Sequence, residues 1–153
     1  MKSPIRKRVN RIYDAVASID SIYEAYASKK KIGYLDMLMF YEILEEAEPL
    51  TQKRLCEILE VSKTTLNSVV KRWSDKGCIE LTQSELRSKE KWIRLTPAGE
   101  IFAHALVDPL FAMEEAAVGR ITDDEIDQVE GIVFKYAFSL SSQIEKMEDM
   151  NHE

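Results

Sequence analysis

Apolar residues spaced three and four positions apart dominate the first fifty residues and predict two helices. Ser3 and Pro4 open the first helix, since serine caps free amides and proline at the first helical position loses no needed donor. Gly33 is expected to take the left-handed conformation that ends it. A second helix is expected over about 34–48, ended by Pro49. The apolar stripe of the first helix comprises Ile5, Val9, Ile12, Val16, Ile19 and Tyr23.

The central part of the chain has shorter periodic segments, which predict two short helices followed by a β-hairpin. Thr51 is placed to cap the first of these helices and Ser62 the second, after a turn of about three residues. Gly77 closes the second helix. Alternating apolar residues then predict two antiparallel strands, at 78–83 and 92–95, around a polar loop.

The last third of the chain is helical again. Thr96 and Pro97 open a fifth helix, which Pro109 should kink or interrupt. Gly119 separates it from a last helix, whose start at 122–125 has capping-box spacing. The predicted fold class is therefore mainly α with a small β-hairpin. The stripe of the last helix comprises Val129, Ile132, Val133, Tyr136, Leu140, Ile144 and Met147.

The fourth predicted helix has two chemically different sides. Its apolar side carries Leu66, Val69, Val70 and Trp73, and no Asp or Glu occurs anywhere from 62 to 74. Hydroxyls and amides can hydrogen-bond to base edges in a major groove, and cations can hold phosphates. The pattern favours a DNA-contacting face, the alternative being the solvated face of an ordinary amphipathic helix. The outward residues are Thr64, Ser68 and Lys71, flanked by Thr65, Asn67 and Arg72.

The formal net charge of −6 at first argues against a nucleic-acid partner, but the charge is unevenly distributed. Residues 51–96 carry 10 basic and 6 acidic side chains, whereas residues 97–153 carry 3 basic and 13 acidic ones. Binding to phosphates requires a positive potential only at the binding face, so the net charge of the whole protein does not need to be positive. The central third has that potential.

Four segments of the chain form an ordered set: TQKRL at 51–55, LEVS at 59–62, VVKRWSDKGCI at 69–79 and LTPAG at 95–99. Taken together in this order, they resemble the MarR (multiple-antibiotic-resistance regulator) family. The resemblance implies a single domain over 1–153, in which 34–96 form a winged helix-turn-helix and 1–33 and 97–153 form flanking dimerisation helices.

The same resemblance assigns DNA contacts to the fourth helix and to the hairpin loop, the wing. Family members often carry Asp-x-Arg in the wing. Counting back from Leu95 without a gap puts Arg87 at the Asp position and Lys89 at the Arg position, whereas a two-residue shift aligns 85–87 instead. Either alignment keeps cations for phosphates, and a solvated turn is the alternative. The predicted DNA-binding residues are Ser62, Lys63, Thr64, Thr65, Asn67, Ser68, Lys71, Arg72, Arg87, Lys89 and Lys91.

The apolar stripes of the first and last helices are wider than a winged domain can cover. The resemblance implies that these helices pair between two subunits, giving a two-fold dimer with recognition helices about one DNA turn apart. Packing of the stripes within one chain is the alternative.

The family resemblance also implies a small aromatic or anionic effector, bound between the dimerisation helices and the winged domain. Aromatic residues at helical spacing are also typical of an ordinary core. The residues proposed to line the effector site are Tyr34, Met37, Tyr41, Phe102 and Leu106.

Other chemistry finds little support in the sequence. Cys56 and Cys78 are expected to be core residues, with a thiol switch as the alternative, and His104 and His152 lack zinc-ligand spacing, so no metal or cofactor is expected. No catalytic motif occurs, which argues against an enzyme. Neither a membrane span nor a signal peptide is recognised, which predicts a cytoplasmic protein.

Together these features predict a DNA-binding transcriptional regulator. The expected form is a ligand-responsive repressor that binds a palindromic operator as a homodimer. The alternative is a winged-helix dimer that serves as a protein-interaction or ligand-sensing module without binding DNA. A salt-dependent DNA titration separates the two, because only phosphate contacts make the affinity fall steeply with salt.

Overall fold

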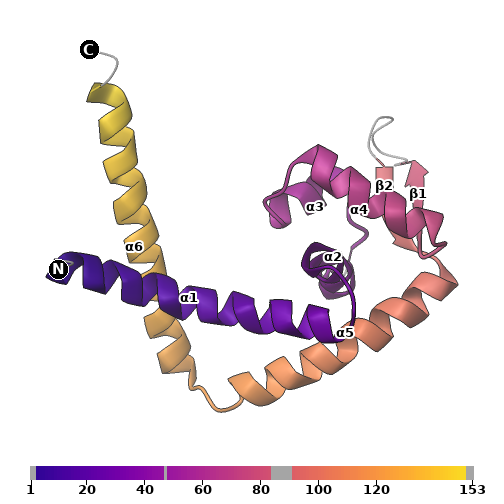
Figure 1. The fold of residues 1–153 in the computed structure, drawn as a ribbon, viewed down its shortest axis with the longest axis horizontal. Coiled ribbons are helices and arrows are strands. Elements are labelled where there is room, and N and C mark those ends of the chain that lie inside the picture. The colour runs from indigo at the N-terminus through magenta and orange to yellow at the C-terminus, as the bar shows by residue number, and fades with distance from the viewer. Residues whose placement is uncertain (1–2, 47, 84–90, 151–153) are drawn as a thin grey trace. The chain divides into compact units, whose positions relative to one another are not determined.

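The computed structural model describes residues 3–46, 48–83 and 91–150. It forms two compact units, Met1–Leu110 and Phe111–Glu153, whose boundary lies inside one helix. The order of elements confirms the predicted class of a mainly α fold with a small β-hairpin wing. The elements are α1 (Pro4–Lys29), α2 (Tyr34–Glu45), α3 (Gln52–Ile58), α4 (Lys63–Asp75), β1 (Ile79–Gln83), β2 (Lys91–Leu95), α5 (Pro97–Val118) and α6 (Asp123–Met150) (Figure 1).

The link between α1 and α2 differs from the prediction. Ser3 caps α1 as expected, its hydroxyl accepting a hydrogen bond from the backbone N–H of Arg6 at 3.3 Å. The left-handed residue after α1 is Lys31, with φ 56°, so the prediction for Gly33 is wrong. Gly33 instead precedes the first turn of α2 with φ −66°. A Cβ atom there would lie 2.4 Å from a carboxylate oxygen of Asp36, so close approach explains this glycine.

The second helix is shorter than predicted. It ends at Glu45, and the following residue, Glu46, already has an extended backbone with ψ 128°. Pro49 disfavours helical conformation only in the residue directly before it. A helix end predicted from the proline alone is therefore placed too late in the chain.

The wing hairpin gains a short third partner. Strands β1 and β2 pair antiparallel, with Leu81 opposite Ile93. The backbone N–H of Ile93 also donates to the carbonyl of Leu50 at 2.8 Å, and Thr51 forms an isolated bridge with Trp92. The segment before α3 is thereby fixed to the wing, a pairing that the sequence did not predict.

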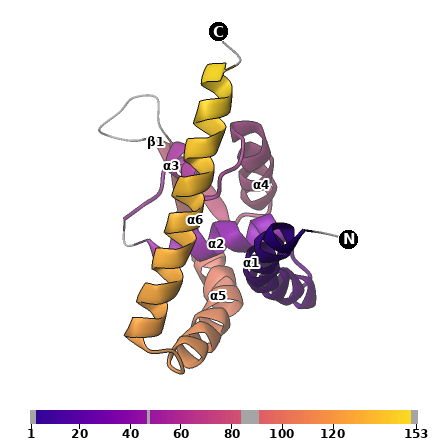
Figure 2. The same ribbon diagram turned by 90° about the vertical axis from the view of Figure 1, so that its left-hand side faces the viewer.

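The core of the first unit lies between α2, α4 and the first half of α5, with α2 in its middle (Figures 1 and 2). Phe40 of α2 and Trp73 of α4 meet edge to face, with ring centroids 4.9 Å apart. Phe102 of α5 lies 5.3 Å from the first ring and 4.8 Å from the second. Such contacts add to the stabilisation from buried area. The largest fully buried side chains are Phe40, Met37, Met39, Leu55, Leu66, Val70 and Val107.

The end of α4 and the start of α5 are joined directly. Thr96 donates from its hydroxyl to the Gly77 carbonyl at 2.6 Å, and the same hydroxyl accepts from the backbone N–H of Gly99 at 3.0 Å. Gly77 has φ 74°, as predicted for a helix-ending glycine. A Cβ atom on Gly99 would lie 1.8 Å from the Cys78 carbonyl oxygen, so only glycine fits there without a backbone shift.

Pro109 does not interrupt α5, which runs continuously from Pro97 to Val118. A proline removes one hydrogen bond of the helix, and the buried side chains of Leu106 and Leu110 hold the helix on either side of it. The Tyr26 hydroxyl of α1 donates to the Leu106 carbonyl at 2.7 Å, which ties α1 to this part of α5.

The second unit contains the end of α5 and the long helix α6. Thr122 and Glu125 form the predicted capping box: the Thr122 hydroxyl accepts from the Glu125 N–H at 3.3 Å, and the Glu125 carboxylate accepts from the Thr122 N–H at 2.9 Å. The hydrogen bonds that Thr122 donates lower the pKa of Glu125. None of the residues of α6 with a described side chain is buried.

The stripes on α1 and α6 remain largely open to solvent in the single chain. On α1, the exposed members are Ile5, Val16 and Ile19, and Ile22 beside them is exposed too. On α6, the exposed apolar side chains are Ile126, Val129, Ile132, Val133, Phe134, Phe138, Leu140, Ile144 and Met147.

The junction between α4 and α5 yields a stability prediction. Gly99→Ala should lower the free energy of unfolding by about 3 kcal/mol, because the new methyl group displaces the backbone of Cys78. Gly131→Ala on α6 is the matched control, because nothing lies within 4 Å of its Cβ position. The control should leave stability unchanged or raise it by up to about 1 kcal/mol. Chemical denaturation measures both, and equal effects of the two variants would refute the tight approach at Gly99.

Candidate nucleic-acid interface

Helix α4 is fixed in the first unit by its apolar side, which leaves its other side open. Leu66, Val69, Val70 and Trp73 are buried. All seven of the predicted contact residues on this helix, together with the capping Ser62, are exposed, which is the arrangement that a recognition helix requires. These seven are Lys63, Thr64, Thr65, Asn67, Ser68, Lys71 and Arg72.

The hydroxyl groups on this face differ in how they are used locally. Ser62 caps α4, because its Oγ accepts from the Thr65 N–H at 3.1 Å, and it shares a 2.8 Å hydrogen bond with the Thr65 hydroxyl. Ser68 donates from its hydroxyl to the Thr64 carbonyl at 3.1 Å within the helix. Ser62 and Thr65 therefore stabilise the start of the helix, whereas Thr64 and Ser68 project one turn apart.

Helices α3 and α4 meet beside a basic depression. The amide of Gln52 on α3 donates to the side-chain oxygen of Asn67 on α4 at 3.1 Å. A depression of about 590 Å³ lies next to this contact. Of the described residues that line it, three are lysines and none is acidic. The lining residues are Thr51, Gln52, Lys53, Cys56, Lys63, Asn67 and Lys91.

The wing is only partly described. Lys91, at the start of β2, is exposed and shares the basic depression with Lys63 of α4. Arg87 and Lys89 lie outside the described residues. The base of the wing and the start of α4 therefore present cations to the same region.

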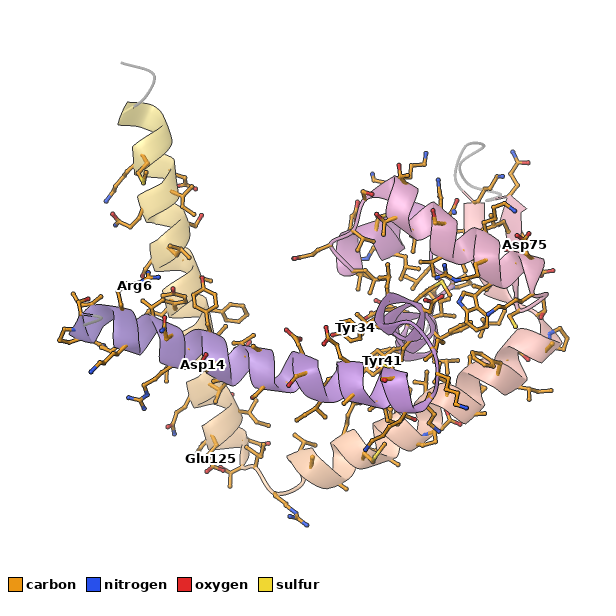
Figure 3. All side chains as sticks on the ribbon, in the orientation of Figure 1. Arg6, Asp14, Tyr34, Tyr41, Asp75 and Glu125 are labelled. Carbon is orange, nitrogen blue, oxygen red and sulfur yellow. The ribbon has the colours of Figure 1, made fainter. Side chains whose placement is uncertain are left out.

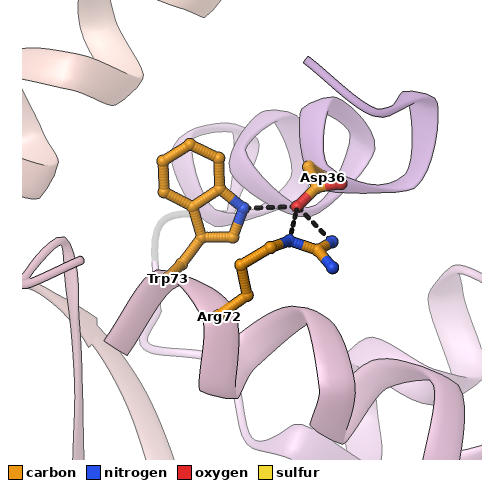
Figure 4. Close-up of polar contacts among 3 residues, drawn as sticks. All are labelled: Asp36, Arg72 and Trp73. Carbon is orange, nitrogen blue, oxygen red and sulfur yellow. Dashed lines mark hydrogen bonds and ion pairs between the residues drawn. The ribbon is translucent and has the colours of Figure 1, made fainter. Parts of the chain in front are cut away.

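Two further cations have partners on the protein. Lys71 forms an exposed ion pair with Asp75 one turn later, at 2.8 Å. Arg72 is exposed as well, but its guanidinium bonds to the buried carboxylate of Asp36 on α2 (Figure 4). Its position next to Trp73, at the edge of the apolar side, explains why the guanidinium reaches this carboxylate.

Sequence reasoning missed Asp36, Gln52 and Lys53. The signal for Asp36 was present, since it is a single acid inside the apolar run from 35 to 40. Buried carboxylates require paired partners, so such a residue should have prompted a search for a distant cation. Gln52 and Lys53 follow the capping Thr51 and gave no comparable signal.

The residues predicted to line an effector site have different environments. Met37 and Leu106 are buried in the core, and Phe102 packs in the aromatic cluster. Tyr34 and Tyr41 are half-buried and project from α2 about two turns apart (Figure 3). Burial and the carboxylates of α1, Asp20 and Glu24, raise the pKa of the Tyr34 phenol. A cavity of about 270 Å³ beside Phe102 is lined by Lys30, Lys31, Ile32, Gly33, Asp36, Arg72, Trp73 and Lys76.

The two cysteines do not form a disulfide bond with each other. Cys56 is half-buried and Cys78 is buried, and both are free thiols. Within the described ranges, no cluster of three or more His, Cys, Asp or Glu residues could hold a metal ion. No helix in that same part of the chain has the length and hydropathy needed to span a membrane.

Comparisons with known proteins agree with this architecture. Residues 35–88 match the model of the MarR family. No curated protein matches the chain. NMB1585, a MarR family regulator from Neisseria meningitidis, superposes with a TM-score of 0.74 at 16% identity, covering 91% of this chain and 97% of that one.

Two similar structures were solved with DNA. A putative MarR family transcriptional regulator from Listeria monocytogenes, complexed with 26mer DNA, has a TM-score of 0.63 at 20% identity and covers 94% of this chain and 92% of that one. MepR from S. aureus, in a DNA complex, has a TM-score of 0.64 at 17% identity, covering 85% and 96%. The chain is a winged helix-turn-helix protein by its fold. The resemblance to the MarR family is thereby confirmed, and its fold is of the MarR type.

The cap of α4 yields a second prediction. Ser62→Ala should lower the free energy of unfolding by about 1 kcal/mol, because the Thr65 N–H loses its acceptor. Ser68→Ala is the control: it is also an exposed serine of this region, but its hydroxyl bonds only within the helix. Its effect should stay within about 0.5 kcal/mol. A Ser62 variant as stable as the Ser68 variant would show that the cap contributes nothing.

Proposed function

We propose that this chain is a DNA-binding transcriptional regulator and that α4 is its recognition helix. The observation that carries the proposal is the outward face of α4, which is exposed, has no acidic residue from 62 to 74 and adjoins the lysine-lined depression. The MarR family regulators solved with DNA support this function by their shared fold. A binding protein of this kind needs no catalytic group, so we propose no enzymatic activity.

The contacts divide into two kinds. Thr64 and Ser68 are assigned to base edges in the major groove, because short hydroxyls on adjacent turns can hydrogen-bond there. Asn67 is placed to assist them, and Ser62 and Thr65 to hold the start of the helix near the phosphates. The cations assigned to phosphates are Lys63, Lys71, Arg87, Lys89 and Lys91.

We further propose that the functional form is a two-fold homodimer. The exposed apolar stripes of α1 and of α6 each support this, since apolar patches on a protein surface mark interaction sites. Two-fold symmetry then matches a palindromic operator with half-sites about one DNA turn apart. In this form the two compact units of each chain would act together as one MarR-like domain in the cytoplasm.

Repression and response to an effector complete the proposal. A dimer that occupies an operator would block transcription. A MarR from S. aureus, which resembles this chain with a TM-score of 0.64 at 17% identity, was solved in complex with salicylate and kanamycin. We propose a small aromatic or anionic effector for this chain too, with Tyr34, Tyr41 and Phe102 as the suggested site residues that are only half-buried.

The base contacts are tested by affinity for two DNA duplexes. The first is enriched by the wild-type protein from a random duplex library, and the second is a scrambled duplex of the same composition. Thr64→Ala should weaken binding to the enriched duplex by about 1–3 kcal/mol and leave binding to the scrambled one nearly unchanged. If both Thr64→Ala and Ser68→Ala keep the wild-type preference for the enriched duplex, the face of α4 proposed to enter the major groove is the wrong one. If the wild-type protein shows no salt-dependent binding to either duplex, the alternative is favoured, in which a winged-helix dimer serves as a protein-interaction or ligand-sensing module without binding DNA.

The phosphate contacts are tested by salt dependence. Lys63→Gln should weaken binding to both duplexes equally and reduce the slope of log affinity against log salt by about one unit. Glu57→Gln on the exposed side of α3 is a control that also changes one charge, and it should not reduce the slope. If Lys63→Gln weakens binding to the enriched duplex only and leaves the salt slope unchanged, Lys63 contacts bases and not phosphates.

The dimer is tested by charges placed in the stripe of α6. Leu140→Asp with Ile144→Asp should dissociate or unfold the protein, because burial of two carboxylates in an apolar interface is unfavourable. Lys135→Glu, on the opposite side of α6, should leave the assembly intact. Analytical ultracentrifugation at micromolar concentration gives the mass of each. A folded monomer in the wild type would refute the proposed homodimer.

A further inference from the structure

Asp36 is an unusual residue for its position in the fold. It is the only charged side chain in the apolar first half of α2, and it is 6% exposed. Gly33, one turn earlier, leaves the space that its carboxylate occupies, since a side chain at that glycine would collide with the Oδ2 atom. A buried carboxylate is expensive without compensating donors, so its retention needs an explanation.

The donors come from two neighbouring residues of the recognition helix. Arg72 donates to Asp36 Oδ1 from Nε at 3.1 Å and from Nη2 at 2.5 Å, and the Trp73 indole Nε1 donates to the same oxygen at 2.5 Å (Figure 4). Hydrogen bonds with an ionised partner are roughly twice as strong as neutral ones. The contact between Asp36, Arg72 and Trp73 is called the α2–α4 latch below.

The latch restricts the rotation of α4 about its own axis. Consecutive side chains of a helix leave it about 100° apart, so two neighbours can bond to one fixed oxygen atom at only one rotation. The Trp73 ring also contacts the rings of Phe40 and Phe102, and the Lys76 ammonium lies 4.0 Å from its centroid. Sliding and rotation of α4 are therefore both opposed at its C-terminal end.

This restraint matters at the other end of the helix. Side-chain atoms lie about 5 Å from a helix axis, so a rotation of about 10° moves them by roughly 1 Å. Hydrogen-bond distances vary by only a few tenths of an ångström, so such a shift breaks a base contact. Phosphate contacts made by long lysine side chains tolerate it, because those side chains are flexible.

We propose that Asp36 is a positioning residue that sets the DNA sequence preference of α4 without touching DNA, and that Arg72 serves the same latch. The proposal rests on the function proposed above. It separates Arg72 from the cations assigned to phosphates, although the sequence had grouped it with them. Loss of the latch should reduce sequence preference while leaving the electrostatic attraction to any duplex.

Asp36→Asn tests the latch with the enriched and scrambled duplexes described above. Affinity for the enriched duplex should fall about tenfold, the scale of one mismatched base pair. Affinity for the scrambled duplex should stay the same or rise, because Arg72 is released from its counter-charge. Asp75→Asn, an exposed acid on α4, is the matched control and should keep the wild-type ratio of the two affinities. A ratio in Asp36→Asn within twofold of the wild type would overturn the proposal.

Arg72→Lys separates positioning from phosphate contact. Lysine keeps the charge but cannot bond to Asp36 through two N–H groups, so the latch predicts a loss of preference similar to that of Asp36→Asn. A phosphate contact would instead survive this substitution, and near wild-type affinity for both duplexes would overturn the proposal. This variant also decides the matter if Asp36→Asn does not fold.

The double variant shows whether the two residues act together. If Asp36 acts through Arg72, combining Asp36→Asn with Arg72→Lys should cost no more preference than the larger single effect. Additive losses would mean independent roles and would contradict the latch. A wild-type protein that does not prefer the enriched duplex would refute the proposed function itself, whereas a wild-type preference that all variants share would refute the latch alone.

Discussion

Burial of one side of α4 against α2 and α5 is the constraint on which the rest of the first unit depends. The rings of Phe40, Trp73 and Phe102 lie at the meeting point of these three helices. This packing decides which side of α4 is available to a partner. One side of the helix belongs to the core, and the opposite side forms the candidate interface. The junction at Gly77 and Gly99 then directs the chain from α4 through the wing into α5.

Features that depend on neighbouring residues could be predicted from the sequence. The caps at Ser3, Ser62 and Thr122 are examples, because a cap is a contact between residues three positions apart. The two-sided character of α4 was likewise visible, since helical periodicity alone determines which residues share a side. These local rules were sufficient for the order of elements and for most of the outward face.

Features that depend on distant residues could not be predicted in this way. Arg72 and Asp36 are 36 positions apart, and no pattern near Arg72 shows that its guanidinium bonds to a carboxylate of α2. The pairing of Leu50 with Ile93 likewise joins segments that periodicity treats separately. At Lys31 and Gly33 the turn was recognised but its left-handed residue was misplaced, because the glycine was needed for the space beside Asp36.

The exposure of α6 has a thermodynamic consequence. Helix α6 has 28 residues and none of its described side chains is buried, so packing within its own chain stabilises it little. Helices in proteins owe most of their stability to the packing of an apolar face. If a second copy supplies that packing, the order of α6 is coupled to association. The melting temperature would then depend on protein concentration through mass action, and a scarce regulator would lose fold and activity together.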